Sequence, residues 1–253
     1  MQHPPEHHAR GGDIPPDWLV RFIPAPATVV LVAPLALLIG SVAAAFAAHV
    51  RARGVRTAYT RKIFHFLIFT GASLIQLGRG VGGVMVYGTV VALLVLYAAW
   101  RGAGHPFYEA LARPNDAPRR TLFIIVPLVT TALGGVLSNV FFPAFAFVGY
   151  LVAGWGDAVG EPVGARWGRH RYSVPSLAGV PATRSLEGSA AVLTVGALAA
   201  GIGCLLAGFP PTSAVRLGLA AGVAGAVVEA VSNHGLDNLT VQLAASAAVS
   251  VMS

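Results

Sequence analysis

The chain contains a single cysteine, Cys204, so no disulfide can form within it. Charged residues are also scarce: they make up 11% of the 253 residues, against 55% hydrophobic ones. That balance excludes an ordinary soluble globular domain. The P-loop, GxSxG and CxxC motifs are absent, and GWGDAVG at 154–160 lacks the preceding strand and the glycine spacing of a dinucleotide-binding fingerprint.

Long apolar runs recur along most of the chain, and they predict membrane-spanning helices. A spanning helix needs roughly 20 apolar residues, with a lower limit near 17. The clearest runs are 27–50, 63–77, 81–100, 122–137, 140–153, 190–209, 214–231 and 239–252. Because several are shorter than this limit, we expect their helices to extend into the polar flanks. We therefore predict an all-α fold, a polytopic membrane bundle of seven to eight transmembrane helices.

The first 26 residues differ from the rest in composition. They are rich in proline and polar residues, and no basic region leads directly into an apolar one, so we expect no cleaved signal peptide. His3, His7 and His8 could touch a metal, but a disordered tail explains them more simply. We predict a disordered polar tail over 1–26 and one integral membrane catalytic domain over 27–253.

Basic residues alternate between loops in a way that predicts the orientation in the membrane. Most of the 17 Lys and Arg residues lie in the first, third and fifth loops. They are Arg51, Arg53, Arg56, Arg61, Lys62, Arg101, Arg113, Arg119, Arg120, Arg166, Arg169, Arg171 and Arg184. The positive-inside rule places these loops, and the seventh, in the cytoplasm, so that eight spans leave both termini outside. The net charge of +7 then reflects orientation and anionic lipid or substrate, with no nucleic-acid partner.

Four polar clusters fall on that same side. They are RKIFH at 61–65, GWGDAVGE at 154–161, TRSLEG at 183–188 and EAVSNHGLDN at 229–238. Ionisable groups beside membrane segments are costly and usually have a function. Clusters from four distant parts of the chain on one membrane face predict a single site.

Lys62, the only lysine, and His65 lie three residues apart on one helical face, where the first loop enters the second span. Lys62 could bind phosphate oxygens as a point charge. Snorkelling to lipid headgroups explains Lys62 equally well, but it does not explain His65, one turn deeper.

Asp157 and Glu161 are one helical turn apart at the end of the fifth span. Two carboxylates on one face repel unless a cation lies near them, and Mg²⁺ binds one or two carboxylates together with substrate phosphates. Gly156 and Gly160 beside them let a helix or a ligand approach the backbone. The alternatives are helix packing for the glycines and an ion pair with an arginine for Asp157.

Further candidates lie in the fifth and seventh loops. Arg169 and Arg184 could neutralise a triphosphate, although positive-inside topology also accounts for them. Ser185 is placed to cap the next helix, whose exposed amides could also bind phosphate. Asp237 and Asn238 could supply metal-binding oxygens from a second element, or simply cap the last helix.

Together these pieces resemble a known family. The matching segments are RKIFHF at 61–66, GDAVGEPVGARWGRHR at 156–171, RSLEGSAAV at 184–192 and HGLDNLTV at 234–241. They resemble the membrane-embedded, CTP-dependent dolichol kinase and phytol kinase family of polyprenol kinases, which is distantly related to phosphatidate cytidylyltransferase. The resemblance covers residues 55–250. The family's usual lysine before SLEG is Arg184 here, which keeps the charge and changes the geometry.

The resemblance implies a kinase at the cytoplasmic face of the cell membrane that uses CTP and Mg²⁺ or another divalent metal. The hydroxyl of a prenyl alcohol, such as phytol or dolichol, would attack the γ-phosphate of CTP and give a lipid phosphate and CDP. Lys62, His65 and Asp157 are then the candidate catalytic residues, and either His65 or a carboxylate accepts the hydroxyl proton. The candidate metal ligands are Asp157 and Asp237, with Glu161 and Asn238 as second choices. The candidate phosphate-binding residues are Lys62, Arg169, Arg184, Ser185, Gly156 and Gly160.

The residues are also compatible with two other functions. A CTP:lipid-phosphate nucleotidyltransferase resembling phosphatidate cytidylyltransferase would use the same metal–triphosphate chemistry. A transporter would also carry ionisable residues, but transporters place them near the middle of the membrane and often contain inverted repeats. Here the charges gather at one surface and no repeat is visible, which disfavours a transporter.

Overall fold

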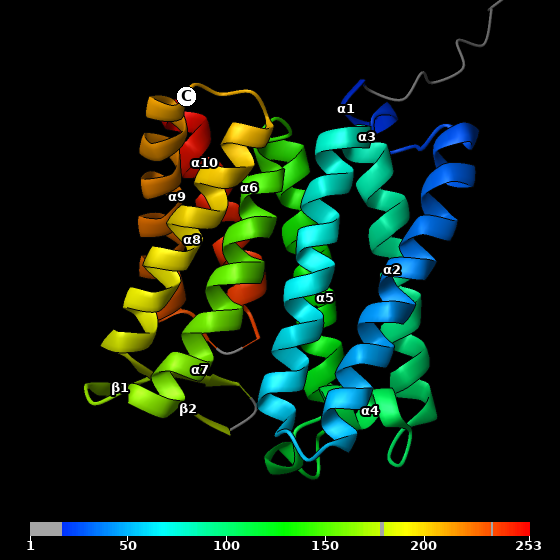
Figure 1. The fold of residues 1–253 in the computed structure, drawn as a ribbon, viewed down its shortest axis with the longest axis vertical. Helices are drawn as coiled ribbons and strands as arrows, with labels where there is room; N and C mark the ends of the chain where they lie inside the picture. Colours follow the sequence, from blue (N-terminus) through cyan, green and yellow to red (C-terminus); the bar gives the residue numbers. More distant parts are fainter. Residues whose placement is uncertain (1–16, 178–179, 234) are drawn as a thin grey trace, which may run out of the picture.

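A computed structural model describes residues 17–177, 180–233 and 235–253 of the chain. Most of the tail that we expect to be disordered, residues 1–16, lies outside the described residues, as does His234. Within the remainder of that tail, α1 (Asp17–Val20) is a short helix. The longer helices run side by side along the long axis of the molecule (Figure 1), as a membrane bundle requires.

The bundle consists of long helices with short connections. Its first half contains α2 (Pro26–Ala52), α3 (Thr57–Arg101), α4 (Pro106–Leu111), the 3-10 turn η1 (Pro114–Asp116) and α5 (Leu122–Phe141). Its second half contains α6 (Ala146–Leu151), the π-helical turn η2 (Val152–Gly156), α7 (Asp157–Trp167), β1 (Arg171–Leu177), β2 (Val180–Ser185), α8 (Leu186–Leu206), α9 (Pro211–Val231) and α10 (Asp237–Met252). In Figure 1, α4, α7, β1 and β2 lie at one end of the bundle, which we call the polar end.

Five helices are long and apolar enough to cross a membrane: α2, α3, α5, α8 and α9. The predicted helical bundle with several spans is therefore confirmed. The count of seven to eight stays a prediction, because α3 is counted once although it covers two of the predicted runs. The last helix, α10, has 16 residues and is short for a span.

The element α3 folds back on itself and supplies two neighbouring helices. Gly80 has φ 65° and ψ −162°, a conformation that interrupts the helix and that other residues rarely adopt. The two halves then pack together, and the Tyr87 hydroxyl donates to the Ile68 carbonyl oxygen at 3.0 Å. The bend falls between the predicted runs 63–77 and 81–100, beside Arg79.

The fifth loop contains a β-hairpin, which the sequence did not predict. Strands β1 and β2 pair antiparallel, with Arg171 opposite Ser185 and Ser173 opposite Thr183. The density of charge, glycine and serine favoured an irregular loop. However, exposed Arg171 and Ser173 alternate with the half-buried Tyr172 and Val174, a pattern that suits a short strand. The fold therefore departs from the all-α prediction at this hairpin, whose end delivers Ser185 to the polar end.

Small residues let neighbouring helices approach closely. A Cβ atom added at Gly218 would lie 2.6 Å from the Ala197 carbonyl oxygen, and one at Gly222 would lie 2.7 Å from the Leu193 carbonyl oxygen. Because no side chain fits there, α8 and α9 pack backbone to backbone. Such small-residue contacts are the usual way in which helices associate inside a membrane.

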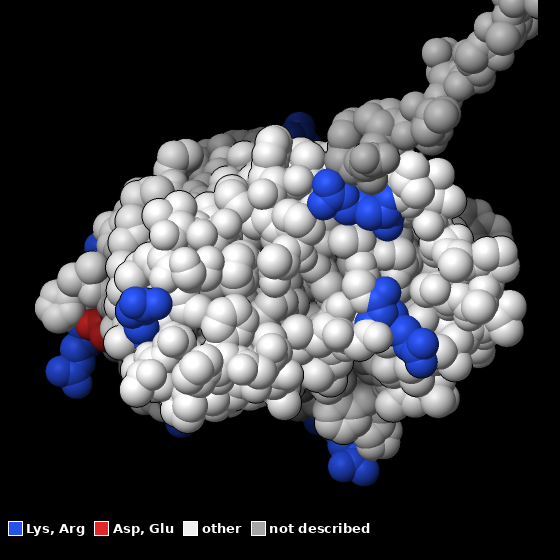
Figure 2. All heavy atoms as spheres, turned by 90° about the horizontal axis from the view of Figure 1, so that it is seen from above, with Lys and Arg blue, Asp and Glu red and all other residues white. Residues whose placement is uncertain are grey.

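The end of the bundle opposite the polar end carries few charges. Seen from that side, the surface shows scattered basic side chains and hardly any acidic ones (Figure 2). This face therefore offers few paired charges that could hold a charged ligand.

We predict that Gly80→Ala destabilises the protein, because its backbone conformation costs about 1–3 kcal/mol for a residue with a Cβ atom. Gly78→Ala is the matched control, since an added Cβ meets no atom within 4 Å at either position and only Gly80 has a positive φ. The control should be neutral or slightly stabilising. Thermal unfolding in detergent measures both variants, and equal midpoints would contradict the strained bend.

Candidate functional site

Lys62 lies at the centre of the polar end, in the second turn of α3, and is almost fully buried. Its Nζ atom is 2.6 Å from Asp157 Oδ2 and 2.7 Å from Glu161 Oε2. Asp157 begins α7 and Glu161 follows one turn later, so one ammonium group bridges both carboxylates. The cation that this carboxylate pair requires is thus a lysine of the chain, whereas the sequence suggested an arginine as the ion-pair alternative.

His65 lies one turn deeper on the same face of α3, as predicted. Its Nε2 atom is 3.3 Å from the Ala153 carbonyl oxygen and 3.6 Å from Asp157 Oδ2. Its ring stacks on Phe69 with the centroids 4.3 Å apart. Because the carbonyl oxygen of Ala153 can only accept, Nε2 is assigned the hydrogen, and the distance from Nε2 to Asp157 is too long for a hydrogen bond.

Two buried polar atoms beside this cluster have no hydrogen-bond partner among the residues described. They are Oδ1 of Asp157 and Nη1 of Arg61. Leaving a buried polar group unsatisfied costs about 1–3 kcal/mol, and more for a charged one. Atoms of this kind in a folded protein call for an explanation such as a water, an ion or a ligand.

A second ion-paired cluster joins β2 to α9 and α10. Arg184 pairs with Glu229 and, at 2.9 Å, with Asp237 Oδ2. Burial acts to lower the pKa of the Arg184 guanidinium, but Glu229, Asp237 and Asp157 outweigh it and hold that pKa above its ordinary value. Asp157 is among the carboxylates that raise this pKa, so the two clusters lie close enough to interact electrostatically.

The residues next to this cluster fix the turns that carry it. Ser185 caps α8, because its hydroxyl oxygen accepts from the Gly188 amide at 3.1 Å, as predicted. Oδ1 of Asp237 accepts hydrogen bonds from the backbone amides of Gly235 at 3.1 Å and Asn238 at 3.0 Å. Asp237 therefore orders the turn before α10 with one oxygen and binds Arg184 with the other.

The structure does not gather the four predicted metal ligands into one group. Asp157 and Glu161 belong to the Lys62 cluster, whereas Asp237 belongs to the Arg184 cluster, and in the described part of the chain no three His, Cys, Asp or Glu side chains are placed to hold a metal. Mg²⁺ needs only one or two carboxylates when substrate phosphates supply the other oxygens. Oδ1 of Asp157, which is buried and has no hydrogen-bond partner among the described residues, could together with Glu161 hold a metal that binds with a nucleotide.

Three predicted phosphate-binding residues take no part in the two ion-paired clusters of the described residues. Arg169 is exposed before β1, and its side chain forms no ion pair with a described residue. Gly156 and Gly160 face α8, where a Cβ atom added at either position would press on Val192. These two glycines therefore serve the packing of η2 and α7 on α8, which is the alternative given for them above.

Three residues of the network were not among the predicted site residues: Arg113, Asp116 and Glu229. Arg113, after α4, places Nη1 3.4 Å from Glu161 Oε1 and Nε 3.0 Å from Asp116 Oδ2. Nothing in the sequence separated Arg113 from the other basic residues of its loop. Glu229 did carry a signal, because it is an acid within the apolar run 214–231, but its partner Arg184 could not be inferred from the spacing.

Carboxylates outnumber cations in this network of ion pairs. The cations are Lys62, Arg113 and Arg184, and the carboxylates are Asp116, Asp157, Glu161, Glu229 and Asp237. Arg61 adds a further positive charge beside these groups. A divalent cation could bind at the carboxylates if phosphate oxygens completed its coordination.

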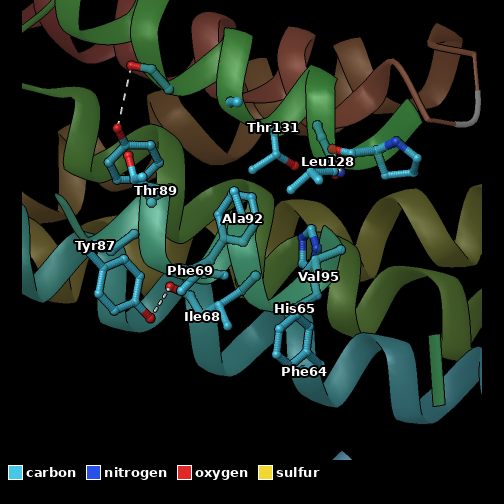
Figure 3. A pocket seen from close by; sticks show the side chains of 18 of the residues that line it. Phe64, His65, Ile68, Phe69, Tyr87, Thr89, Ala92, Val95, Leu128 and Thr131 are labelled. Carbon is cyan, nitrogen blue, oxygen red and sulfur yellow. Dashed lines mark hydrogen bonds between the residues drawn. The ribbon is translucent and has the colours of Figure 1, made fainter. Parts of the chain in front are cut away.

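An apolar groove begins beside His65 and continues into the bundle. It has a volume of about 310 Å³ and lies between the two halves of α3 and α5. In Figure 3, Phe64 and His65 stand at one end of the row of side chains and Tyr87 at the other. Arg61, His65 and Asn238 line the groove at its polar end, and most of the remaining lining is aliphatic or aromatic. The charged network thus adjoins a site suited to a hydrocarbon chain.

Comparison with known proteins gives one informative similarity. The chain is 38% identical over 114 residues to a protein named phytol kinase from Synechocystis sp. (strain ATCC 27184 / PCC 6803 / Kazusa). The match covers 43% of this chain and 46% of that relative, so the chain spans about half the length of the curated protein that it matches. No family model matches the chain. No solved structure matches it either.

We predict that Arg184→Met destabilises the protein by about 3–5 kcal/mol, because it removes the cation that two buried carboxylates share. Adding Glu229→Gln should recover part of this loss. Arg169→Met is the matched control: its side chain is exposed, and a change within about 0.5 kcal/mol is expected. Thermal unfolding in detergent measures all three, and an equal loss for both arginine variants would show that the buried pairs are not what stabilises the polar end.

Proposed function

We propose that the protein is a kinase that transfers the γ-phosphate of CTP to the hydroxyl of a prenyl alcohol, such as phytol, dolichol or another polyprenol. The observation that carries the proposal is the position of the Lys62–Asp157 pair beside the polar end of an apolar groove in a helical membrane bundle. An alcohol with its tail in the groove would bring its hydroxyl to the charged groups. The relative named phytol kinase supports this acceptor and this type of transfer.

Phosphoryl transfer requires the protein mainly to position its substrates and to neutralise charge. Lys62 is a compact cation suited to phosphate oxygens, and Arg113 and Arg184 add positive charge nearby. A nucleotide triphosphate is itself highly negative, so a further cation beside these carboxylates would favour its binding. Mg²⁺ or another divalent metal, held by Asp157 and Glu161, would supply that charge to the phosphate oxygens. The choice of CTP rests on the resemblance of the polar loops to the polyprenol kinases.

The surroundings of His65 narrow the choice of proton acceptor. Its Nε2 atom donates to the Ala153 carbonyl oxygen, so only Nδ1 of this ring keeps a lone pair for a proton. Oδ1 of Asp157, in contrast, has no hydrogen-bond partner among the described residues. We therefore propose that a carboxylate of the Lys62 cluster accepts the hydroxyl proton as the phosphate is transferred.

We place the polar end in the cytoplasm, where CTP is available, because the basic loops gather there and the opposite face carries few charges (Figure 2). In a Cys204→Ala background, Arg56→Cys and Ser173→Cys should resist a membrane-impermeant maleimide in intact cells and react after permeabilisation. Ala207→Cys, in the exposed connection between α8 and α9, is the control that should react in intact cells. Strong labelling at position 56 or 173 in intact cells would reverse the orientation.

We predict that Asp157→Asn reduces phosphate transfer by at least about 100-fold while the protein still inserts in the membrane, because it removes charge from the proposed metal site. Chelation with EDTA should abolish transfer, and Mg²⁺ should restore it. Glu161→Gln should raise the Mg²⁺ concentration needed for half-maximal rate. Glu109→Gln removes a carboxylate that pairs with Arg120 at the same end and should leave the rate near wild type. A near-normal rate for Asp157→Asn at saturating Mg²⁺ would refute the metal assignment.

The direct test of the reaction incubates the purified protein with phytol and CTP labelled at either the α- or the γ-phosphate. Kinase activity puts only γ-label into the organic phase, as a lipid phosphate. In a parallel incubation with phosphatidate in place of phytol, retention of α-label and cytidine in the lipid, with release of pyrophosphate, would instead establish nucleotidyl transfer to a lipid phosphate. Absence of both products with every lipid alcohol and with phosphatidate would refute the kinase and favour a transporter.

A further inference from the structure

The apolar groove is not closed on all sides. Its inner wall is buried, as at Tyr87, which is 1% exposed. By contrast, four lining residues are exposed: Gly88 and Thr89 on α3, and Ala132 and Val136 on α5. These two pairs face the same groove from different helices. They border a gap in its wall, which we call the lateral opening.

The lateral opening lies within the membrane-spanning part of the bundle, away from the polar end. Both α3 and α5 are long and apolar enough to cross a membrane. Ile124, in the buried part of the groove, and Val136, at the opening, are separated by twelve residues of α5, or about 18 Å along a helix. Val129 and Leu133, large apolar residues on the same helix, are also exposed. A hydrocarbon tail that leaves the groove through this opening therefore enters the lipid and not water.

We propose that a lipid alcohol with a single hydrocarbon chain enters the groove sideways from the bilayer through the lateral opening, and that its tail still passes through this opening when its hydroxyl is at the polar end. The identity of the reacting hydroxyl rests on the proposed function. The polar end offers that hydroxyl a hydrogen-bond donor. Arg61 lines the groove, and its buried Nη1 atom has no acceptor among the described residues.

The dimensions and lining of the groove favour a lipid with a single hydrocarbon chain. Its volume of about 310 Å³ lies at the lower end of the range for small-molecule sites. Beyond the polar end the lining is mostly aliphatic and aromatic, with few hydroxyls such as that of Thr131, so the ester groups of a diacylglycerol would lose water there and find few partners to replace it. A prenyl alcohol has no polar group apart from its hydroxyl and avoids this cost.

The lateral opening also determines how kcat/KM depends on the length of the lipid alcohol. Carbon atoms beyond the opening lie in lipid both before and after binding, so they gain no burial from water. Phytol and a much longer polyprenol should therefore show kcat/KM values within about threefold of each other, which is less than 1 kcal/mol. A groove closed at its far end would reject the longer alcohol.

Gly88→Phe tests the lateral opening directly by placing a ring in it. A Cβ atom added at Gly88 meets no atom within 4 Å, so the variant should fold. Ala132→Phe obstructs the opening from α5 and serves as a second variant. Gly78→Phe is the matched control, because Gly78 is exposed on the same helix, has equally open surroundings and does not line the groove.

We expect Gly88→Phe and Ala132→Phe to lower kcat/KM for phytol by about tenfold or more, with KM for CTP unchanged, and Gly78→Phe to stay within about twofold of wild type. A phytol analogue with a photoreactive group on its tail should crosslink to the groove-lining parts of α3 and α5 in the wild type, and this labelling should fall in both obstructed variants. Crosslinks confined to other helices, or labelling unchanged in both variants, would overturn the proposal. Because crosslinking needs no phosphate transfer, groove labelling by a protein without kinase activity would support the lateral opening and refute the proposed function.

Discussion

The polar end depends on one buried ionic interaction, in which the ammonium group of Lys62 bridges Asp157 and Glu161. Lys62 and Asp157 are each less than a tenth exposed, and a charge buried to this extent is tolerated only with its partner, because its desolvation costs several kcal/mol. The bridge ties α3 to α7. The adjoining pairs of Arg184 tie β2 to α9 and α10, so that five elements from distant parts of the sequence are joined at one end of the bundle.

The bend at Gly80 connects this charged network to the apolar groove. Because α3 turns back there, a single element supplies Lys62 and His65 with its first half and much of the groove wall with its second half. The fold thus places a hydrocarbon-binding site and a charged site next to each other without a long loop. This proximity is what a reaction between a lipid hydroxyl and a charged, water-soluble donor requires.

The sequence predicted those features that follow from local pattern. The apolar runs predicted the helices, including the two that meet at the Gly80 bend, and the spacing of Lys62 and His65 predicted their shared face, because each depends on residues close along the chain. Ionic partners depend on how distant helices are aligned, so the bridge from Lys62 to Asp157, the role of Arg113 and the pairing of Glu229 were not predictable. The groove was not predictable either, since its walls look like any other apolar helix surface. The hairpin was missed because its composition resembles that of an irregular loop.

The central claim is that Lys62 and Asp157 act as one unit in the proposed phosphate transfer, and a double-mutant cycle tests it most directly. The rate constant for transfer from CTP to phytol would be measured for wild type, Lys62→Gln, Asp157→Asn and the double variant, with membrane insertion verified for each. The account predicts strong non-additivity, with a coupling energy of at least about 1 kcal/mol, because either single change disrupts the same pair. Additive effects of the two substitutions on the transfer rate would contradict the account.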